Sequence, residues 1–233
     1  MNRRFLAIAT DPAIIPGVHH YCDEWCDYCA VTRRCLAFRC ISEWRKQRGR
    51  SPAGPPFVSM DEAARFTREL ADAEGTRTDE LDAMFANPSG LSALVESDPL
   101  ASTAWEYAIR VAVFLMPVTG AIAALEPRPA GPEPEEIVVW CHLRIYMSMF
   151  QALVSARRHP TANSGGGDAL GCAKRTIVMA ARSWHALQAL RTGDRAAEID
   201  ALVSLLDGLE RGIDERFPGA RSFVRLGLDL PVA

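Results

Sequence analysis

The sequence lacks a hydrophobic run long enough to cross a membrane. Its longest stretch without a charged residue covers residues 111–125, fifteen positions, and Pro117 lies inside it. A membrane-spanning helix needs roughly 20 apolar residues. We therefore expect this stretch to form a buried helix, and we expect no membrane partner.

The N-terminus also lacks the features of a secretory leader. Its apolar residues 5–9 are too few for such a segment, and Asp11 and Pro12 lie directly beyond Thr10 and prevent the apolar run from continuing. We therefore expect the protein to be cytoplasmic. Thiols stay reduced in that compartment, and seven cysteines is an odd number, so we expect no disulfide framework.

An overall excess of basic charge is absent as well. The formal net charge is −3, which argues against a nucleic-acid binder. The charge is nevertheless uneven, because residues 1–50 carry nine Arg or Lys against five Asp or Glu, a net +4. The remaining residues carry a net −7. We therefore expect the basic segment to bind an acidic partner, and we do not expect the chain to bind a nucleic acid.

The sequence has no convincing strand alternation, no internal repeat, and no HExxH, G-x-S-x-G or P-loop pattern. None of the histidines at positions 142, 159 and 185 has a Glu three places before it, which argues against a ferritin-type di-iron site. What remains is helical periodicity. The fold class we expect is therefore all-α, a bundle of four to five long helices.

Local signals predict where these helices begin and end. Ser59 and Glu62 form a capping box for a helix over 60–74. Further starts are expected at Asp98-Pro99, at Pro134, at Asp168 and at Asp194. The helix after Pro134 is apolar on most sides, which predicts a place at the centre of the core. Stops or breaks are predicted at Pro117, in the loop 159–167, at Gly193 and at Pro218.

The proline- and glycine-rich segment 48–59 is the expected boundary between two parts of the chain. Residues 1–50 would form a Cys-rich metal-binding segment, too small for a core of its own and docked on the bundle. Residues 59–217 would form the helical bundle, and residues 218–233 an irregular tail packed on it.

Four cysteines lie within fourteen positions of HHYCDEWCDYCAVTRRC, residues 19–35, with the spacing C-x3-C-x2-C-x5-C. In one continuous helix Cys22, Cys26 and Cys29 would share a face and could be mere packing residues. In the other interpretation the helix breaks near residues 30–31, and Thr32 caps a new helix that turns Cys35 toward the other three. A closed site of four thiolates would result.

Both a [4Fe–4S] cluster and a zinc ion accept four thiolates. Zinc sites usually combine two C-x2-C pairs, and this stretch holds one, so we expect the cluster, with one zinc ion as the alternative. The other candidate ligands are His19, His20 and Cys40. The aromatic residues between the cysteines would shield a cluster from water, or they would be the seam that docks the segment; they are Tyr21, Trp25 and Tyr28.

The cysteine loop resembles known iron–sulfur loops. CDYCAVTRRC is similar to the end of the [4Fe–4S] loop in DNA glycosylases and some helicase-nucleases, and CDEWCDYC has the spacing of radical SAM enzymes. Both resemblances cover under a tenth of the chain, and neither family's fold is indicated by the remaining sequence.

A broader resemblance spans most of the chain. The sequence resembles a family of uncharacterised bacterial all-helical proteins with the same N-terminal cysteine motif. This resemblance supports metal binding and implies no reaction. It is carried by Ile15-Pro16-Gly17, residues 21–29, Trp140, residues 171–174, Arg182-Ser183-Trp184 and residues 217–229.

Polar residues on otherwise apolar helices are the candidates for a pocket in the bundle, and salt bridges are the plainer explanation for them. The expected pocket residues are Glu106, Arg110, Lys174 and Arg182. Two functions are therefore expected. The protein is a metalloprotein whose cluster is structural or redox-active, or it is an enzyme with a small-molecule pocket in the bundle and a structural zinc site.

Overall fold

The computed structural model describes residues 2–51, 56–75, 93, 97–115, 131–158 and 166–230. These residues are mostly helical. The described part contains no strand beyond one isolated bridge between Leu226 and Leu230, so the expected all-α class is confirmed.

The chain forms two compact units. One comprises Met1–His19, Cys29–Gly90 and Arg225–Ala233, and the other comprises His20–Tyr28 and Leu91–Val224. We call them the N-terminal unit and the bundle unit.

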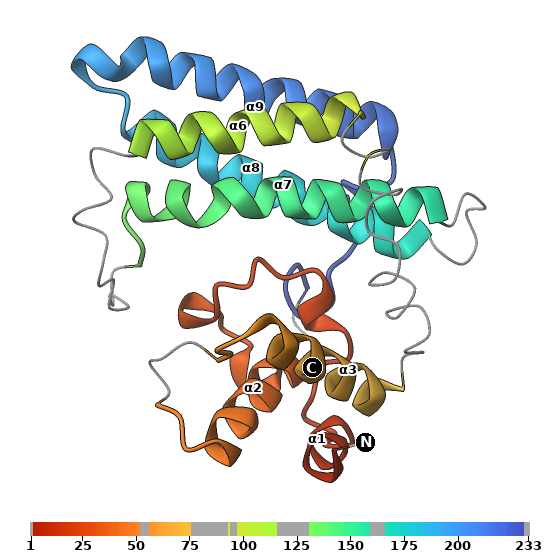
Figure 1. Cartoon of the computed structure of the whole chain (residues 1–233). Coiled ribbons are helices and arrows are strands. Elements are labelled where there is room, and N and C mark those ends of the chain that lie inside the picture. The colour runs from red at the N-terminus through yellow and green to blue at the C-terminus, as the bar shows by residue number, and fades with distance from the viewer. Residues whose placement is uncertain are drawn as a thin grey trace. The chain divides into compact units, whose positions relative to one another are not determined.

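The described part of the bundle unit contains four long helices (Figure 1). They are α6 (Pro99–Leu115), α7 (Pro134–Arg158), α8 (Gly166–Ala189) and α9 (Ala196–Arg216). Each helix packs on two neighbours: α7 packs on α8 and α6, and α9 packs on both α6 and α8. This closed arrangement surrounds one apolar core, as expected for a four-helix bundle.

Local capping explains the starts of these helices. The Asp98 carboxylate accepts a hydrogen bond from the backbone amide of Leu100 at 3.1 Å, directly before Pro99 opens α6. Glu136 accepts one from the amide of Glu133 at 2.9 Å at the start of α7. Both starts are as predicted. Helix α8 begins two residues before the expected Asp168. Pro117 and residues 159–165 lie outside the described residues.

Helix α7 lies in the core, as its apolar composition predicts. One of its faces is fully buried along its length, by Val138, Cys141, Ile145, Met149, Ala152 and Leu153. By length and composition alone, Pro134–Arg157 could also cross a membrane, a criterion that core helices of soluble proteins meet too. In this structure 44% of its most apolar stretch is buried.

The N-terminal unit has a core of its own, which differs from the expectation of a coreless segment. It contains α1 (Arg3–Ala9), α2 (Leu36–Gln47) and α3 (Met60–Glu74). Phe66 of α3 packs edge-on against Phe5 at 5.5 Å and against Trp44 at 5.4 Å between ring centroids. Helix α3 therefore belongs with the first 50 residues, and the expected boundary at 48–59 lies inside this unit.

The bounds of α3 are as predicted. Ser59 accepts a hydrogen bond from the amide of Glu62 at 3.2 Å, and the Glu62 carboxylate accepts one from the amide of Val58 at 2.9 Å. Gly75 ends the helix with a φ of 73°, a conformation that favours glycine.

The C-terminal tail is irregular, as expected, but it is shared between the units. Residues up to Val224 belong to the bundle unit, and those from Arg225 belong to the N-terminal unit. There Gly227 lies so close to Ile15 that an added Cβ would approach the Ile15 Cδ1 atom to 2.8 Å. The tail therefore does not pack on the bundle alone.

Candidate functional site

The cysteine stretch is not a continuous helix. Residues 18–34 contain three separate 3₁₀ turns, Val18–His20, Cys26–Tyr28 and Thr32–Arg34. The interpretation of the cysteines as one packing face of a helix is therefore wrong. Cys22, Cys26 and Cys29 are partly exposed. They are available for chemistry in a way that core cysteines are not.

Helix α2 begins at Leu36, three residues after the predicted start, and Thr32 does not cap it. Cys35 itself is the N-cap residue. The backbone amides of Ala37 and Phe38 face its sulfur and lower the pKa of the thiol. Burial is the larger effect, and the pKa of Cys35 is raised overall. A bound cation would offset this burial, because metal ligation favours the thiolate.

The four cysteines are divided equally between the two units. Cys22 and Cys26 lie in the segment His20–Tyr28 of the bundle unit, and Cys29 and Cys35 lie in the N-terminal unit. Each unit thus contains two of the four thiols of the motif.

Tyr21 anchors the segment His20–Tyr28 on the bundle. Its hydroxyl donates a hydrogen bond to the Asp168 carboxylate at 2.6 Å, and its ring meets Phe223 edge-on at 5.1 Å. The ring lies directly over Gly171 of α8, where an added Cβ would overlap it. A glycine at this position therefore lets the segment approach the helix backbone.

Asp23 and Trp25 hold the same segment on α7 and α8. Trp25 stacks on Trp140, with ring centroids 5.1 Å apart and planes 13° apart. The Trp140 indole donates a hydrogen bond to the Asp23 carbonyl at 2.9 Å, and the Asp23 carboxylate pairs with Arg182. Tyr21 and Trp25 are thus a docking seam, which was one of the two roles expected for these aromatic residues.

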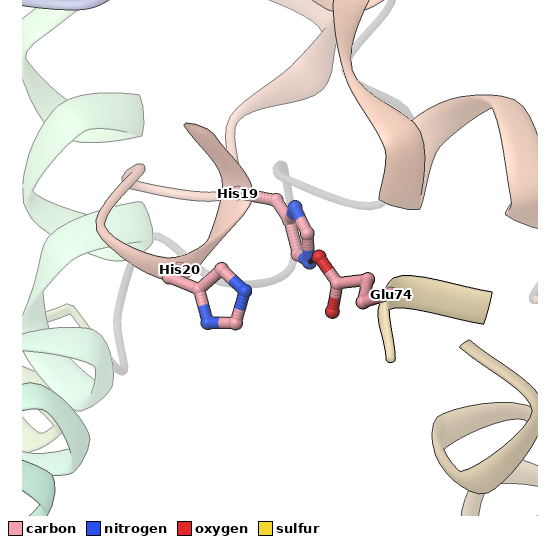
Figure 2. A group of neighbouring side chains, drawn as sticks. All are labelled: His19, His20 and Glu74. Carbon is pink, nitrogen blue, oxygen red and sulfur yellow. Dashed lines mark ion pairs between the residues drawn. The ribbon is translucent and has the colours of Figure 1, made fainter. Parts of the chain in front are cut away.

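The other candidate metal ligands differ in burial, because His20 is exposed and Cys40 is buried. His19 pairs with Glu74 in the N-terminal unit (Figure 2), with Nε2 3.2 Å from Oε1 and both side chains mostly buried. His20 is the next residue and begins the segment of the bundle unit. Cys40 is fully buried in the core with Phe5 and Trp44, and burial raises the pKa of its thiol to about 12. Its surroundings are those of a packing residue.

The four residues expected to line a bundle pocket do not converge. Glu106 and Arg110 pair with each other on the exposed face of α6, at 2.6 Å. Lys174 donates to the Arg221 carbonyl at 2.7 Å, and Arg182 pairs with Asp23. These contacts match the plainer explanation, in which such residues form salt bridges and surface hydrogen bonds.

A different pocket lies in the bundle unit, where the docked segment meets α7 and α8. It has a volume of about 260 Å³, and its polar lining comes from Cys22, Asp23, Glu24, Arg144, Ser148, Gln151 and Arg175. Glu24 and Arg175 were not among the predicted pocket residues. One signal was available for Arg175, because it is one of two adjacent charged residues, with Lys174, inside the otherwise apolar stretch GCAKRTIVMAA of a predicted helix.

The comparisons with known proteins add no family to this description. No protein-family model, curated protein or solved structure matches the chain.

Proposed function

We propose that this protein binds a metal centre through Cys22, Cys26, Cys29 and Cys35, and that the centre is a [4Fe–4S] cluster. The observation that carries the proposal is the series of short turns in residues 18–34, which excludes one continuous helical packing face as the explanation for the closely spaced thiols. Four thiolates within one short stretch are the donor set that such a cluster requires.

The surroundings of the individual cysteines support the proposal. Cys22 and Cys26 lie in a segment that Tyr21, Asp23 and Trp25 hold in place, so two ligands would be ordered before the metal arrives. Burial raises the pKa of the Cys35 thiol, and two backbone amides partly offset this effect by favouring the thiolate. The cluster would supply one-electron transfer or would serve as a structural clip. The arginines of residues 33–50 would offer an acidic partner a docking surface.

A zinc ion is the second candidate, and one observation favours it. Metal-ligating histidines are usually oriented by a carboxylate on the other ring nitrogen. His19, immediately before the cysteine stretch, has such a carboxylate in Glu74. In this alternative His19 replaces one cysteine, and the site is structural.

The metal content of protein purified without oxygen tests the proposal. We expect brown protein with an absorption band near ~400 nm and about four irons and four sulfides per chain. Cys29→Ser should lose the colour and most of the iron. Cys172→Ser is the matched control, because Cys172 is a buried thiol of α8 outside the motif.

The outcomes separate the candidates. One zinc per chain in colourless protein, lost in His19→Ala as well as in Cys29→Ser, would support the structural zinc site instead. Protein without metal, or iron retained in Cys29→Ser, would contradict metal binding by this stretch.

A further inference from the structure

We propose that the pocket beside Cys22 binds a small organic acid, whose carboxylate lies between the guanidinium groups of Arg144 and Arg175. The proposal does not rest on the proposed metal centre, although Cys22 also lines the pocket. It lies wholly within the bundle unit, where the segment His20–Tyr28 meets α7 and α8, and it is lined by residues of all three.

Arg175 is the floor of this site. Its side chain is only 6% exposed, and neutral groups hold it in place. Its Nε donates to the Ser148 hydroxyl at 2.7 Å, and its Nη2 donates to the Gln151 side-chain oxygen. The third nitrogen, Nη1, makes only long contacts, at 3.4 Å to the Cys22 carbonyl and 3.6 Å to a Glu24 oxygen. A buried cation without a close carboxylate is costly, so this guanidinium edge is suited to receive an anion.

Arg144 supplies the second cation from α7. Its guanidinium carbon lies over the Trp140 ring, 3.7 Å from the centroid, and its Nη1 donates to the Trp140 carbonyl at 3.3 Å. Its Nε is buried and has no hydrogen-bond acceptor among the described residues. A Glu24 oxygen lies 3.7 Å away, beyond hydrogen-bonding distance. Arg144 is therefore oriented by the ring and keeps one donor for a ligand.

The Glu24 carboxylate already lies between these two guanidinium groups. The backbone of Glu24 is also strained. Its φ is 60°, and it is the one non-glycine residue with a positive φ in the described part of the chain. Its side chain is 57% exposed, and neither ion pair is shorter than 3.6 Å. Strained backbone held in place by its surroundings is typical of functional sites. We infer that Glu24 is an internal carboxylate that a ligand's carboxylate replaces.

The apolar residues that line the pocket favour an organic acid over an inorganic anion. Leu143 and Met147 are about half exposed at the mouth of the pocket, and Met179 is fully buried in its wall. An apolar group on the ligand would cover this surface. Because drug-sized pockets measure roughly 300–1,000 Å³, a pocket of about 260 Å³ suits a small acid.

Calorimetric titration with benzoate, acetate and inorganic phosphate tests the proposal on the whole purified chain, with its metal content recorded. We expect benzoate to bind more tightly than acetate or phosphate. Glu24→Gln should bind benzoate at least tenfold more tightly than the wild type, because the competing carboxylate is gone. Arg144→Gln should bind it at least tenfold more weakly. Arg191→Gln is the matched control, because Arg191 is an exposed arginine of the same unit that pairs with Asp200.

Leu143→Glu gives an independent check should Arg144→Gln fail to fold. It places a negative charge at the exposed mouth of the pocket and should weaken benzoate binding without disturbing the core. Equal affinities in all variants, no binding by Glu24→Gln, or a preference for inorganic phosphate over benzoate would overturn the proposal. Because none of these substitutions touches a thiol, unchanged metal content would separate a failure here from a failure of the proposed metal centre.

Discussion

Single buried residues couple this fold to pH. Cys141 of α7 is 1% exposed, and burial raises the pKa of its thiol to about 12, although the nearby Arg144 acts in the opposite direction. Tyr107 is also fully buried, with its hydroxyl 2.5 Å from the Ser183 hydroxyl, and burial raises its pKa as well. In the unfolded chain both groups would release their protons at lower pH.

We predict that stability falls above about pH 9 because of such groups. Between the ordinary thiol pKa and about 12, folded Cys141 keeps its proton and the unfolded chain loses it. The folded state then binds more protons, so the free energy of unfolding decreases as pH rises. Cys141→Ala should flatten this decrease by up to about 1.4 kcal/mol per pH unit. Denaturant titrations between pH 8 and 11 measure the slope, and identical slopes would contradict the assignment.

At the scale of the element, the docked segment depends on close approach to α8. Tyr21 lies over Gly171, and the same ring is held by Asp168 and Phe223. Displacing a ring with three such contacts would cost free energy. By contrast, Gly208 in α9 has open space, with the nearest other atom 4.0 Å from an added Cβ.

Two glycine-to-alanine substitutions should therefore have opposite effects. Gly171→Ala should destabilise the bundle unit, because overpacking of about 1–3 kcal/mol exceeds the gain in helix propensity of about 1 kcal/mol. Gly208→Ala should stabilise it by about 0.5–1 kcal/mol. Thermal unfolding of both variants measures the difference. A stabilised Gly171→Ala would mean that the segment is not seated on α8.

Helix bounds were largely predictable, because capping is local. Ser59 with Glu62, and Asp98 with Pro99, act within four residues of each other, and both predicted starts are confirmed. Thr32 failed as a predicted cap because the chain continues in a 3₁₀ turn up to Cys35. Three-residue turns of this kind have no periodicity that a sequence pattern could reveal.

At the scale of the whole molecule, the chain alternates between its two units. The tail returns to the N-terminal unit, where Leu228 packs against a small core of Ile15, Val18 and Cys35. Its neighbour Leu226 is 58% exposed. The N-terminal unit therefore includes the last described residues of the chain, more than 180 positions after Cys35.

Substitutions in the tail should weaken the N-terminal unit and spare the bundle. Leu228→Ala should destabilise that unit by about 1–3 kcal/mol through lost burial, whereas Leu226→Ala should change its stability by less than about 0.5 kcal/mol. Hydrogen exchange reports the two units separately. We expect faster exchange in α2 of Leu228→Ala, with α7 unchanged. Equal effects of the two substitutions would contradict the assignment of the tail.

By itself, the sequence determined the all-α class, most helix starts, the buried course of α7 and the choice of the cysteine stretch as the candidate metal site. These depend on periodicity, capping and spacing, which act over a few residues. Only the tertiary structure decided the membership of α3, the docking of Tyr21 and the pocket around Arg175. The reason is separation along the chain: Tyr21 meets Asp168 across 147 positions, and Arg175 meets Cys22 across 153. No local pattern encodes such pairings, because they arise when separate elements bury their apolar faces together.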